Sequence, residues 1–232
     1  MIDPTKPILV ISDLQIPYEH KDALKLCYYL KRNHKIPDCN VLCVGDEVDQ
    51  LHGSNYPKDP NVPMSPTSEI GMARRKIKEW AEHFPLMKIA VSNHGLRWIR
   101  KASMAEIPDI MIRRYQEVMH MPEGWAFKEE WKFENLKYPF RMIHGMGYSG
   151  KDGHRNAALD AGISTIIGHL HSFAAVDFIE MNGHKPLWAC NTGCLIDRES
   201  YAFKYEKYNR TKPVLGATII FHKGKMPVFY PL

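Results

Sequence analysis

Six short segments of the sequence each place a potential metal ligand directly after an apolar run. The segments are 12–15, 45–49, 92–95, 143–145, 168–171 and, as a weaker sixth, 191–193. Their side chains are carboxylates, amides and imidazoles, and this mixture of oxygen and nitrogen donors suits a divalent transition metal. Two such ions about 3.5–4 Å apart form the clamp that is used in the hydrolysis of phosphate esters. The donor types therefore favour metal-assisted hydrolysis, provided that the fold brings the segments together.

Each of these signals is weak when it is taken alone. An aspartate after a strand is usually a turn former or a helix cap, and a histidine on an apolar segment is more often a hydrogen-bonded core residue. The joint pattern reverses this balance, because several donor types recur at equivalent positions. Histidines outside the pattern are interpreted as structural, and these are His52, His83, His120, His154, His184 and His222.

The first part of the sequence alternates between strands and helices that could position the donors. Apolar runs and helical periodicity predict, in order, a strand at 7–11, a helix at 21–32, a strand at 40–44, a helix at 70–84 that begins near Ser65 and Pro66, and a strand at 88–91. This alternation with short connections predicts a parallel sheet with helices on its outside.

Ligands of such a sheet bind beyond the carboxyl ends of its strands. Asp13, Asp46 and Asn93 each follow one of the predicted strands, while His144 and His169 follow two further apolar runs. We therefore expect these five side chains to lie along one edge of the fold.

The C-terminal part has short strands and few helices. Strands are predicted at 164–167, 174–179, 186–190, 217–221 and 228–230, with a hairpin turn at Asn182-Gly183. They predict a mixed or antiparallel second sheet, and two sheets packed face to face with helices outside would give an α/β four-layer αββα sandwich. We expect a single domain over 1–232. Segments 51–64 and 105–140 are expected to shape a substrate pocket, the latter with a helix at 107–119.

Composition limits the classes of protein to consider. The chain has 232 residues, a formal net charge of +5 and a pI near 8.8. This mild surplus permits an anionic partner and is weaker than the basic stripe of a dedicated DNA-binding domain. Neither a membrane-spanning run nor a signal pattern is found, which favours a cytoplasmic protein without a membrane partner. The five cysteines are expected to be reduced, and a zinc pair at Cys190 and Cys194 is the weaker alternative.

Taken in order, the motifs resemble those of the calcineurin-like metallophosphoesterase superfamily. That family carries Asp-x-His, Gly-Asp-x-x-Asp, Gly-Asn-His followed by an acidic residue, a lone His and Gly-His-x-His, and the resemblance extends from Asp13 to His171. It implies the αββα fold already expected. Short bacteriophage members are similar in having an Arg-Trp pair after the Asn-His segment, here Arg97-Trp98, which suggests a viral or bacterial source and, if viral, the host cytoplasm.

The resemblance also implies a dinuclear metal centre. Asp46 would bridge both ions, Asp13 and His171 would hold the first, and Asn93, His144 and His169 would hold the second. A hydroxide bridging the ions would attack phosphorus in line. His94 would protonate the leaving oxygen, and Asp49 would fix the tautomer of His94. Arg97 and Arg100 follow closely and are candidates for binding substrate phosphate.

Three positions depart from the family pattern. Gln15 stands where the family has histidine, and its neutral amide is a poorer donor for transition metals than imidazole. Gln15 is still expected to be a ligand, but of a weaker first site that favours Mn²⁺ over Fe, Zn or Ni, with His20 as a remote substitute. Ser92 and Gly95 replace a glycine and an acidic residue, which leaves the geometry of their loop open.

The favoured function is hydrolysis of a phosphodiester in a nucleotide or nucleic acid, either DNA or RNA. A phosphomonoesterase acting on protein or a small metabolite is one alternative, and a non-catalytic scaffold that keeps the fold is another. Segment 201–210 interleaves aromatic and basic side chains, which could stack bases or could form a solvated face. The sequence leaves the oligomeric state open.

Overall fold

A computed structural model describes residues 1–55, 64–180, 186–200 and 211–232. The first of its two sheets has the strand order β11-β10-β1-β2-β3-β4. Its strands are β1 (Ile8–Ile11), β2 (Val41–Cys43), β3 (Met87–Ala90), β4 (Trp125–Lys128), β10 (Gly216–Phe221) and β11 (Met226–Pro231). Strands β1 to β4 are parallel, and every residue of β1 and β2 is buried, as expected for strands covered on both faces.

The second sheet has the order β5-β6-β7-β9-β8. Its strands are β5 (Glu130–Phe133), β6 (Phe140–Ile143), β7 (Ser164–Ile167), β8 (Ala175–Ile179) and β9 (Leu187–Asn191). Strands β6, β7 and β9 are parallel, and the edge strands β5 and β8 are antiparallel to their neighbours. The sheet is therefore mixed, as predicted, while the predicted turn at Asn182-Gly183 lies outside the described residues.

The C-terminal hairpin is placed differently from the sequence expectation. Strands β10 and β11 were expected in the second sheet, but β10 pairs antiparallel with β1, with Ile8 opposite Ile220. Five of the six β10 residues are buried, which suits an interior position between β1 and β11 better than an exposed edge.

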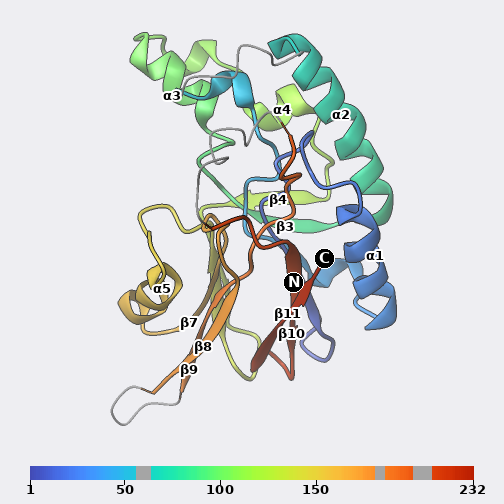
Figure 1. Ribbon diagram of the computed structural model, residues 1–232, viewed down its shortest axis with the longest axis vertical. Coiled ribbons are helices and arrows are strands. Elements are labelled where there is room, and N and C mark those ends of the chain that lie inside the picture. Colours follow the sequence, from blue (N-terminus) through green and yellow to red (C-terminus); the bar gives the residue numbers. More distant parts are fainter. Residues whose placement is uncertain (56–63, 181–185, 201–210) are drawn as a thin grey trace.

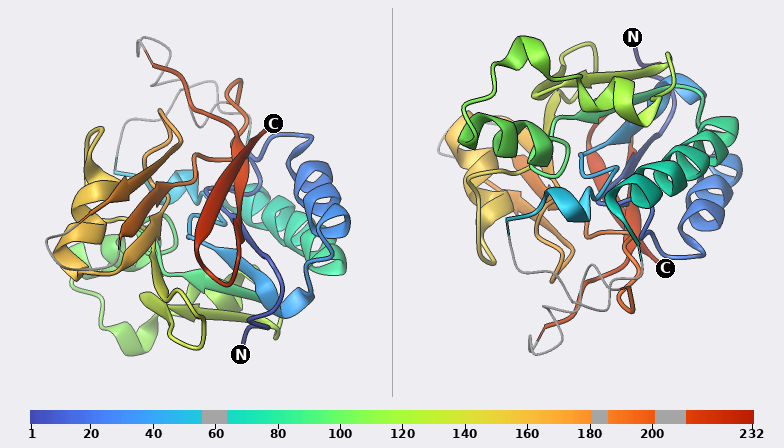
Figure 2. Two further views of the ribbon diagram at one scale, coloured as in Figure 1. Left: turned by 90° about the horizontal axis from the view of Figure 1, so that it is seen from below. Right: turned by 90° about the horizontal axis from the view of Figure 1, so that it is seen from above.

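Helices cover the outer faces of both sheets. Helices α1 (Ala23–Asn33) and α2 (Pro66–His83) lie on one side of the molecule and α5 (Gly153–Ala161) lies on the other, with the sheets between them (Figures 1 and 2). Along β1, Leu9 and Ile11 belong to the apolar cluster beneath α1 and α2, whereas Ile8 and Val10 belong to the cluster between the sheets. This two-residue alternation fills two separate cores and confirms the αββα sandwich.

Helix α2 begins as the sequence indicates. The hydroxyl of Ser65 accepts a hydrogen bond from the backbone nitrogen of Ser68 at 3.2 Å, and Pro66 occupies the first turn. The apolar side chains Ala73, Ile77 and Trp80 are buried on one face. The helix ends at His83, just before Phe84 and Pro85.

The predicted helix at 107–119 is wrong. The chain instead forms α3 (Arg97–Met104), a 3₁₀ turn η3 (Asp109–Met111) and a short α4 (Tyr115–Met119), followed by β4 and β5. Pro108 has an extended backbone, and every residue from 103 to 111 is exposed, so no packing supports a helix there. In α4 only Tyr115 and Met119 are buried. The packing of these two side chains determines where the chain becomes helical again.

Candidate metal centre

The predicted donors follow strands of both sheets. Asp13, Asp46 and Asn93 come after β1, β2 and β3 of the first sheet, and His144 and His169 come after β6 and β7 of the second. These strands are parallel within each sheet, so their carboxyl ends lie at a common edge of that sheet.

Two groups of side chains place their ligand atoms within 4.8 Å of one another. One group is Asp46, His144 and His169, and the other is Asp13, Asp46 and His171. Asp46 belongs to both, because its carboxylate lies between the two sets of imidazoles. This sharing is what a bridging ligand between two cations requires.

Asn93 joins the first of these groups. Its Oδ1 lies 2.8 Å from Nε2 of His144, and Nε2 of His144 lies 3.3 Å from Oδ2 of Asp46. The other ring nitrogen of His144, Nδ1, lies 2.9 Å from the carbonyl oxygen of Val44. A backbone carbonyl at Nδ1 fixes the ring so that Nε2 faces the centre, an arrangement common for metal-binding histidines.

Gln15 lies beside the second group. Its Nε2 is 3.4 Å from Nε2 of His171, which in turn is 3.0 Å from Oδ1 of Asp13. The other amide atom, Oε1, is buried and has no hydrogen-bond partner among the described residues. An unpaired buried oxygen costs free energy, and a cation would satisfy it. The donor set therefore fits a pair of divalent ions, with the Gln15 amide at the edge of one position.

The backbone around the donors adopts conformations that non-glycine residues rarely occupy. Asp13, Gln15, Asp46 and His169 have φ angles of 45°, 50°, 49° and 67°. Each such residue costs of order 1 kcal/mol or more, and such strain gathers at functional sites. These unusual backbone conformations orient the four side chains towards the candidate metal centre.

Gly168 allows the two sheets to approach at the centre. A Cβ atom added to Gly168 would lie 2.4 Å from both Oδ2 of Asp13 and Oγ of Ser12. Any side chain there would collide with a proposed metal ligand. The glycine before His169 therefore belongs to the construction of the site.

Electrostatics favour a charged Asp46. Burial alone raises the pKa of its carboxyl, but the imidazoles of His144 and His94 hold the pKa of Asp46 well below its usual range. Burial alone would lower the pKa of the His144 imidazole, but the neighbouring Asp46 carboxylate outweighs burial, so the pKa of His144 is raised. Burial and neighbouring His144 lower the pKa of His169. A buried anion among imidazoles is a setting that attracts cations.

His94, Asp49 and Arg97 form a cluster next to the donors. Nδ1 of His94 lies 2.9 Å from Oδ1 of Asp49, close enough for an ion pair although not aligned as a hydrogen bond. Arg97 donates from Nη1 to the carbonyl oxygen of Asp49 at 2.7 Å, and its Nη2 lies 2.7 Å from Nε2 of His94. The imidazole is thus held between a carboxylate and a guanidinium.

A cavity of about 240 Å³ opens beside this cluster. It is lined by Asn93, Arg97 and Arg100 together with Gly53, Ser54 and Asn55. Two arginines therefore border the space next to a donor of the metal centre. The segment 51–64 that was expected near the pocket contributes residues 53–55, and its residues 56–63 lie outside the described ranges.

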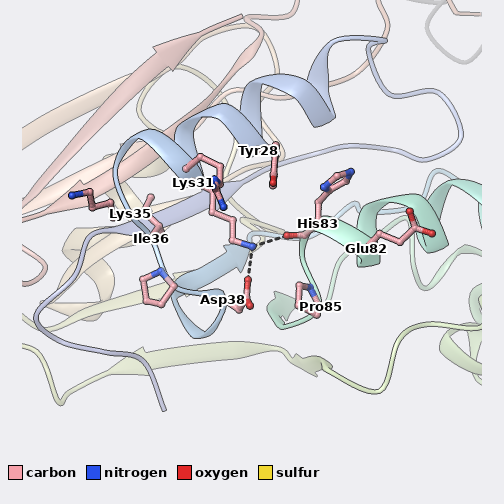
Figure 3. Close-up of a pocket in the computed structure, with 10 residues that line it drawn as sticks. Tyr28, Lys31, Lys35, Ile36, Asp38, Glu82, His83 and Pro85 are labelled. Carbon is pink, nitrogen blue, oxygen red and sulfur yellow. Dashed lines mark hydrogen bonds and ion pairs between the residues drawn. The ribbon is translucent and has the colours of Figure 1, made fainter.

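A larger cavity of about 600 Å³ lies between α1 and the end of α2. None of the predicted site residues lines it (Figure 3). Nζ of Lys31 pairs there with Asp38 and donates to the carbonyl oxygen of His83 at 2.6 Å. This amine is already satisfied, so the cavity adds nothing to the chemistry of the metal centre.

Two residues support loops of the centre through contacts that the sequence did not predict. Gln50 donates from Nε2 to the carbonyl oxygens of His94 and Gly95, at 2.9 and 3.1 Å. Asn191, in the weak sixth segment, donates from Nδ2 to the carbonyl oxygens of Leu170 and Phe173, at 2.7 and 2.6 Å, and so holds the loop that follows His169. No local motif marks these roles, because each depends on contacts between distant segments.

Comparison with known proteins places the fold. No protein-family model matches the sequence, and no curated protein matches it significantly. Among solved structures, vacuolar protein sorting 29 (Vps29) from Cryptosporidium parvum matches with a TM-score of 0.50 and 16% identity, covering 98% of this chain and 91% of that chain. The phosphoesterase YfcE from E. coli has a TM-score of 0.47 and 10% identity, covering 93% and 88%.

At these identities the likeness concerns the fold alone. The chain shares the sandwich fold of Vps29 from Cryptosporidium parvum, and this αββα fold is the one that the sequence led us to expect. Within the described ranges, no helix has both the length and the apolar character needed to span a bilayer.

Proposed function

We propose that this chain is a metal-dependent phosphoesterase with a dinuclear centre. The observation that carries the proposal is the position of Asp46, which belongs to two donor groups whose ligand atoms lie within 4.8 Å of one another. A single structural ion would need only one such group. The pairing of donors around a shared carboxylate is the arrangement suited to two ions acting on one phosphate.

The chain's own residues divide the binding task between them. Asp13 and His171, with Gln15 beside them, would hold one ion, and Asn93, His144 and His169 would hold the other, with Asp46 between. When bound, two divalent ions supply positive charge that polarises a phosphoryl oxygen and activates a water molecule as nucleophile. The mixture of neutral amide, carboxylate and imidazole donors favours Mn²⁺.

His94 is proposed as the group that protonates the leaving oxygen. Its Nδ1 faces Asp49 at 2.9 Å, while its Nε2 lies 2.7 Å from Nη2 of Arg97 in this structure. Nε2 would carry the proton for the leaving oxygen once the Arg97 guanidinium turns from His94 to the substrate phosphate. Asp49 is nearly fully buried and is anchored by Nη1 of Arg97 at 3.2 Å, so it holds the ring in one orientation. The proton leaves Nε2 as the ester oxygen takes up the electrons of the broken P–O bond.

The substrate class we favour is a phosphodiester of a nucleotide or nucleic acid. The support is the cavity beside Asn93, which Arg97 and Arg100 line with positive charge that suits a phosphate group. The formal net charge of +5 agrees with an anionic substrate.

The proposal is tested with the purified full chain, stripped of metal and reloaded with Mn²⁺. Hydrolysis is measured with bis-p-nitrophenyl phosphate, p-nitrophenyl phosphate, and single- and double-stranded DNA and RNA. We expect hydrolysis that depends on added metal and is faster for the diester than for the monoester. The Asp46→Asn variant should lose both metal binding and activity, and the exposed Asp160→Asn variant should keep both.

His94→Ala separates catalysis from metal binding. We expect this variant to bind Mn²⁺ like the wild type, measured by isothermal titration calorimetry, and to hydrolyse the diester about 10²-fold or more slowly. His222→Ala, at an exposed histidine, serves as the control. A faster reaction with the monoester would favour the phosphomonoesterase alternative. Bound metal without hydrolysis of any of these substrates would favour the non-catalytic scaffold and refute the enzyme.

A further inference from the structure

Tyr115 packs its ring against the backbone of the loop 92–95. A Cβ atom added at Gly95 would lie 2.8 Å from Cζ of Tyr115 and 3.0 Å from its hydroxyl oxygen. The ring cannot easily move aside, because Tyr115 is only 5% exposed and contacts Phe127 edge-on, with ring centroids 6.0 Å apart. Position 95 therefore has room for a hydrogen atom and for nothing larger.

The hydroxyl of Tyr115 also reaches the segment that follows β2. It interacts electrostatically with the carboxyl of Glu47, although neither group has a well-aligned hydrogen bond among the described residues. Glu47 is fully buried and directly follows Asp46. One side chain from α4 thus touches both of the segments that carry the central donors.

The same loop is held from a second direction by Gln50. The Gln50 amide donates to the carbonyl oxygens of His94 and Gly95, and the backbone nitrogen of His94 donates to Oδ1 of Asp46 at 3.2 Å. Gln50 is 2% exposed, so solvent does not compete for these bonds. The loop is held through its main chain by Gln50 and braced by the ring of Tyr115.

We infer that Tyr115 is a positioning residue for the metal centre. The Tyr115 ring packs against Gly95, and the Gln50 amide binds the carbonyl oxygens of the same loop. Together these contacts fix the distance of Asn93 and His94 from Asp46. The Tyr115 ring fills the space where a side chain at position 95 would begin. The inference rests on the proposed function, and it gives α4, within the segment 105–140, a role in building the site.

A double-mutant cycle tests this contact. Gly95→Ala should drive the new methyl group into the ring and displace the loop, which lowers kcat for the diester about tenfold or more with little change in KM. Tyr115→Leu alone should also lower kcat, because the loop loses its support. In the double variant the new methyl group occupies part of the space that the ring leaves, so this variant should be more active than Gly95→Ala alone. Tyr230→Leu, on the distant edge strand β11, should leave kcat unchanged.

Metal spectroscopy gives a readout that does not depend on turnover. The wild type, Gly95→Ala, Tyr115→Leu and the double variant are loaded with Co²⁺, and their visible absorption is compared after thermal melting has shown that each is folded. We expect Gly95→Ala to alter the cobalt spectrum, because Asn93 moves with the loop, and Tyr115→Leu to restore it in the double variant.

The two proposals fail in different ways. A wild-type chain that hydrolyses nothing overturns the proposed function, and the cobalt spectra then decide on Tyr115 alone. If Gly95→Ala matches the wild type in both spectrum and kcat, or if the folded double variant is no better than Gly95→Ala, the positioning role is refuted.

Discussion

At the scale of single residues, Gln15 is the candidate donor that most distinguishes the proposed metal centre. Its amide stands beside His171, and Oε1 is buried without a partner among the described residues. A neutral amide oxygen attracts a divalent transition ion less strongly than an imidazole does. The two metal positions should therefore have unequal affinities, with the position next to Gln15 the weaker one.

The substitution Gln15→His tests this asymmetry. An imidazole in place of the amide should strengthen binding of the second equivalent of Zn²⁺ by about tenfold or more and leave the first nearly unchanged. Calorimetric titration of the metal-free chain measures both equivalents, and Gln116→His on α4 is the control. Identical titrations of the wild type and Gln15→His would show that position 15 does not contact an ion.

The positions of the candidate donors were predictable from the sequence. Asp13, Asp46 and Asn93 follow apolar runs that read clearly as buried strands, so their common edge could be inferred before any coordinates were known. Arg97 could be placed near His94 because it follows three residues later in the sequence, but its contact with Asp49 could not be predicted. That contact depends on the direction in which α3 begins after the loop 92–95, and no local sequence pattern specifies this direction.

At the scale of elements, the positions of the candidate donors are set by the points where strands end and loops begin. The parallel strands and the helices α1 and α2 were predicted closely, because their periodicity is strong and Ser65 gives a clear start signal. The region 97–119 was predicted poorly, because its helices bury few side chains and are fixed by tertiary contacts. One such contact is that of Arg74, whose Nε donates to the carbonyl oxygen of Val118 at 2.7 Å.

Gly168→Ala tests the junction between β7 and the centre. Its new Cβ would stand 2.4 Å from Asp13 and Ser12, so the His169 loop must shift away from Asp13. We expect a loss of about 1–3 kcal/mol in the free energy of unfolding and weaker binding of Mn²⁺. Urea unfolding of the metal-free chain and calorimetry of the metal measure these two effects separately.

Gly71→Ala is the matched control for that substitution. Gly71 lies inside α2, and nothing approaches its added Cβ within 4 Å. Alanine there should raise the free energy of unfolding by about 0.5–1 kcal/mol and leave metal binding unchanged. If Gly168→Ala behaved like Gly71→Ala, the close approach of the two sheets at the centre would not matter.

At the scale of the whole molecule, metal binding should stabilise the fold. The donors come from loops of both sheets and converge only when the sandwich has formed. Ions that bind the folded chain and not the unfolded one add about 2.7 kcal/mol at a free concentration of 100 Kd. The melting temperature should therefore rise with Mn²⁺ in the wild type and should not respond in Asp46→Asn, as measured by circular dichroism. An equal rise in both would place the stabilising ion elsewhere.

The pH dependence of stability should show the contribution of Glu69, a buried carboxyl on α2. Its Oε1 accepts a hydrogen bond from the backbone nitrogen of Leu51 at 2.6 Å, which ties α2 to the turn that follows Asp49. Burial, with Asp49 nearby, raises the pKa of Glu69 from 4.5 to about 7. A raised pKa means that the folded chain binds this proton more tightly than the unfolded chain, so the stabilisation is complete below about pH 4.5 and is lost as the pH rises towards 7.

Glu69→Gln keeps the acceptor for Leu51 and removes the ionisation. Relative to this variant, the wild type should lose up to about 3 kcal/mol of unfolding free energy between pH 4.5 and pH 7. Urea unfolding of the metal-free chains across this range measures the difference, and Glu79→Gln, exposed on the same helix, should run parallel to the wild type. If the curves of the wild type and Glu69→Gln were also parallel, Glu69 would be charged in the folded chain throughout this range. The link between α2 and the turn after Asp49 would then be an ionised carboxylate that its backbone donors fully stabilise.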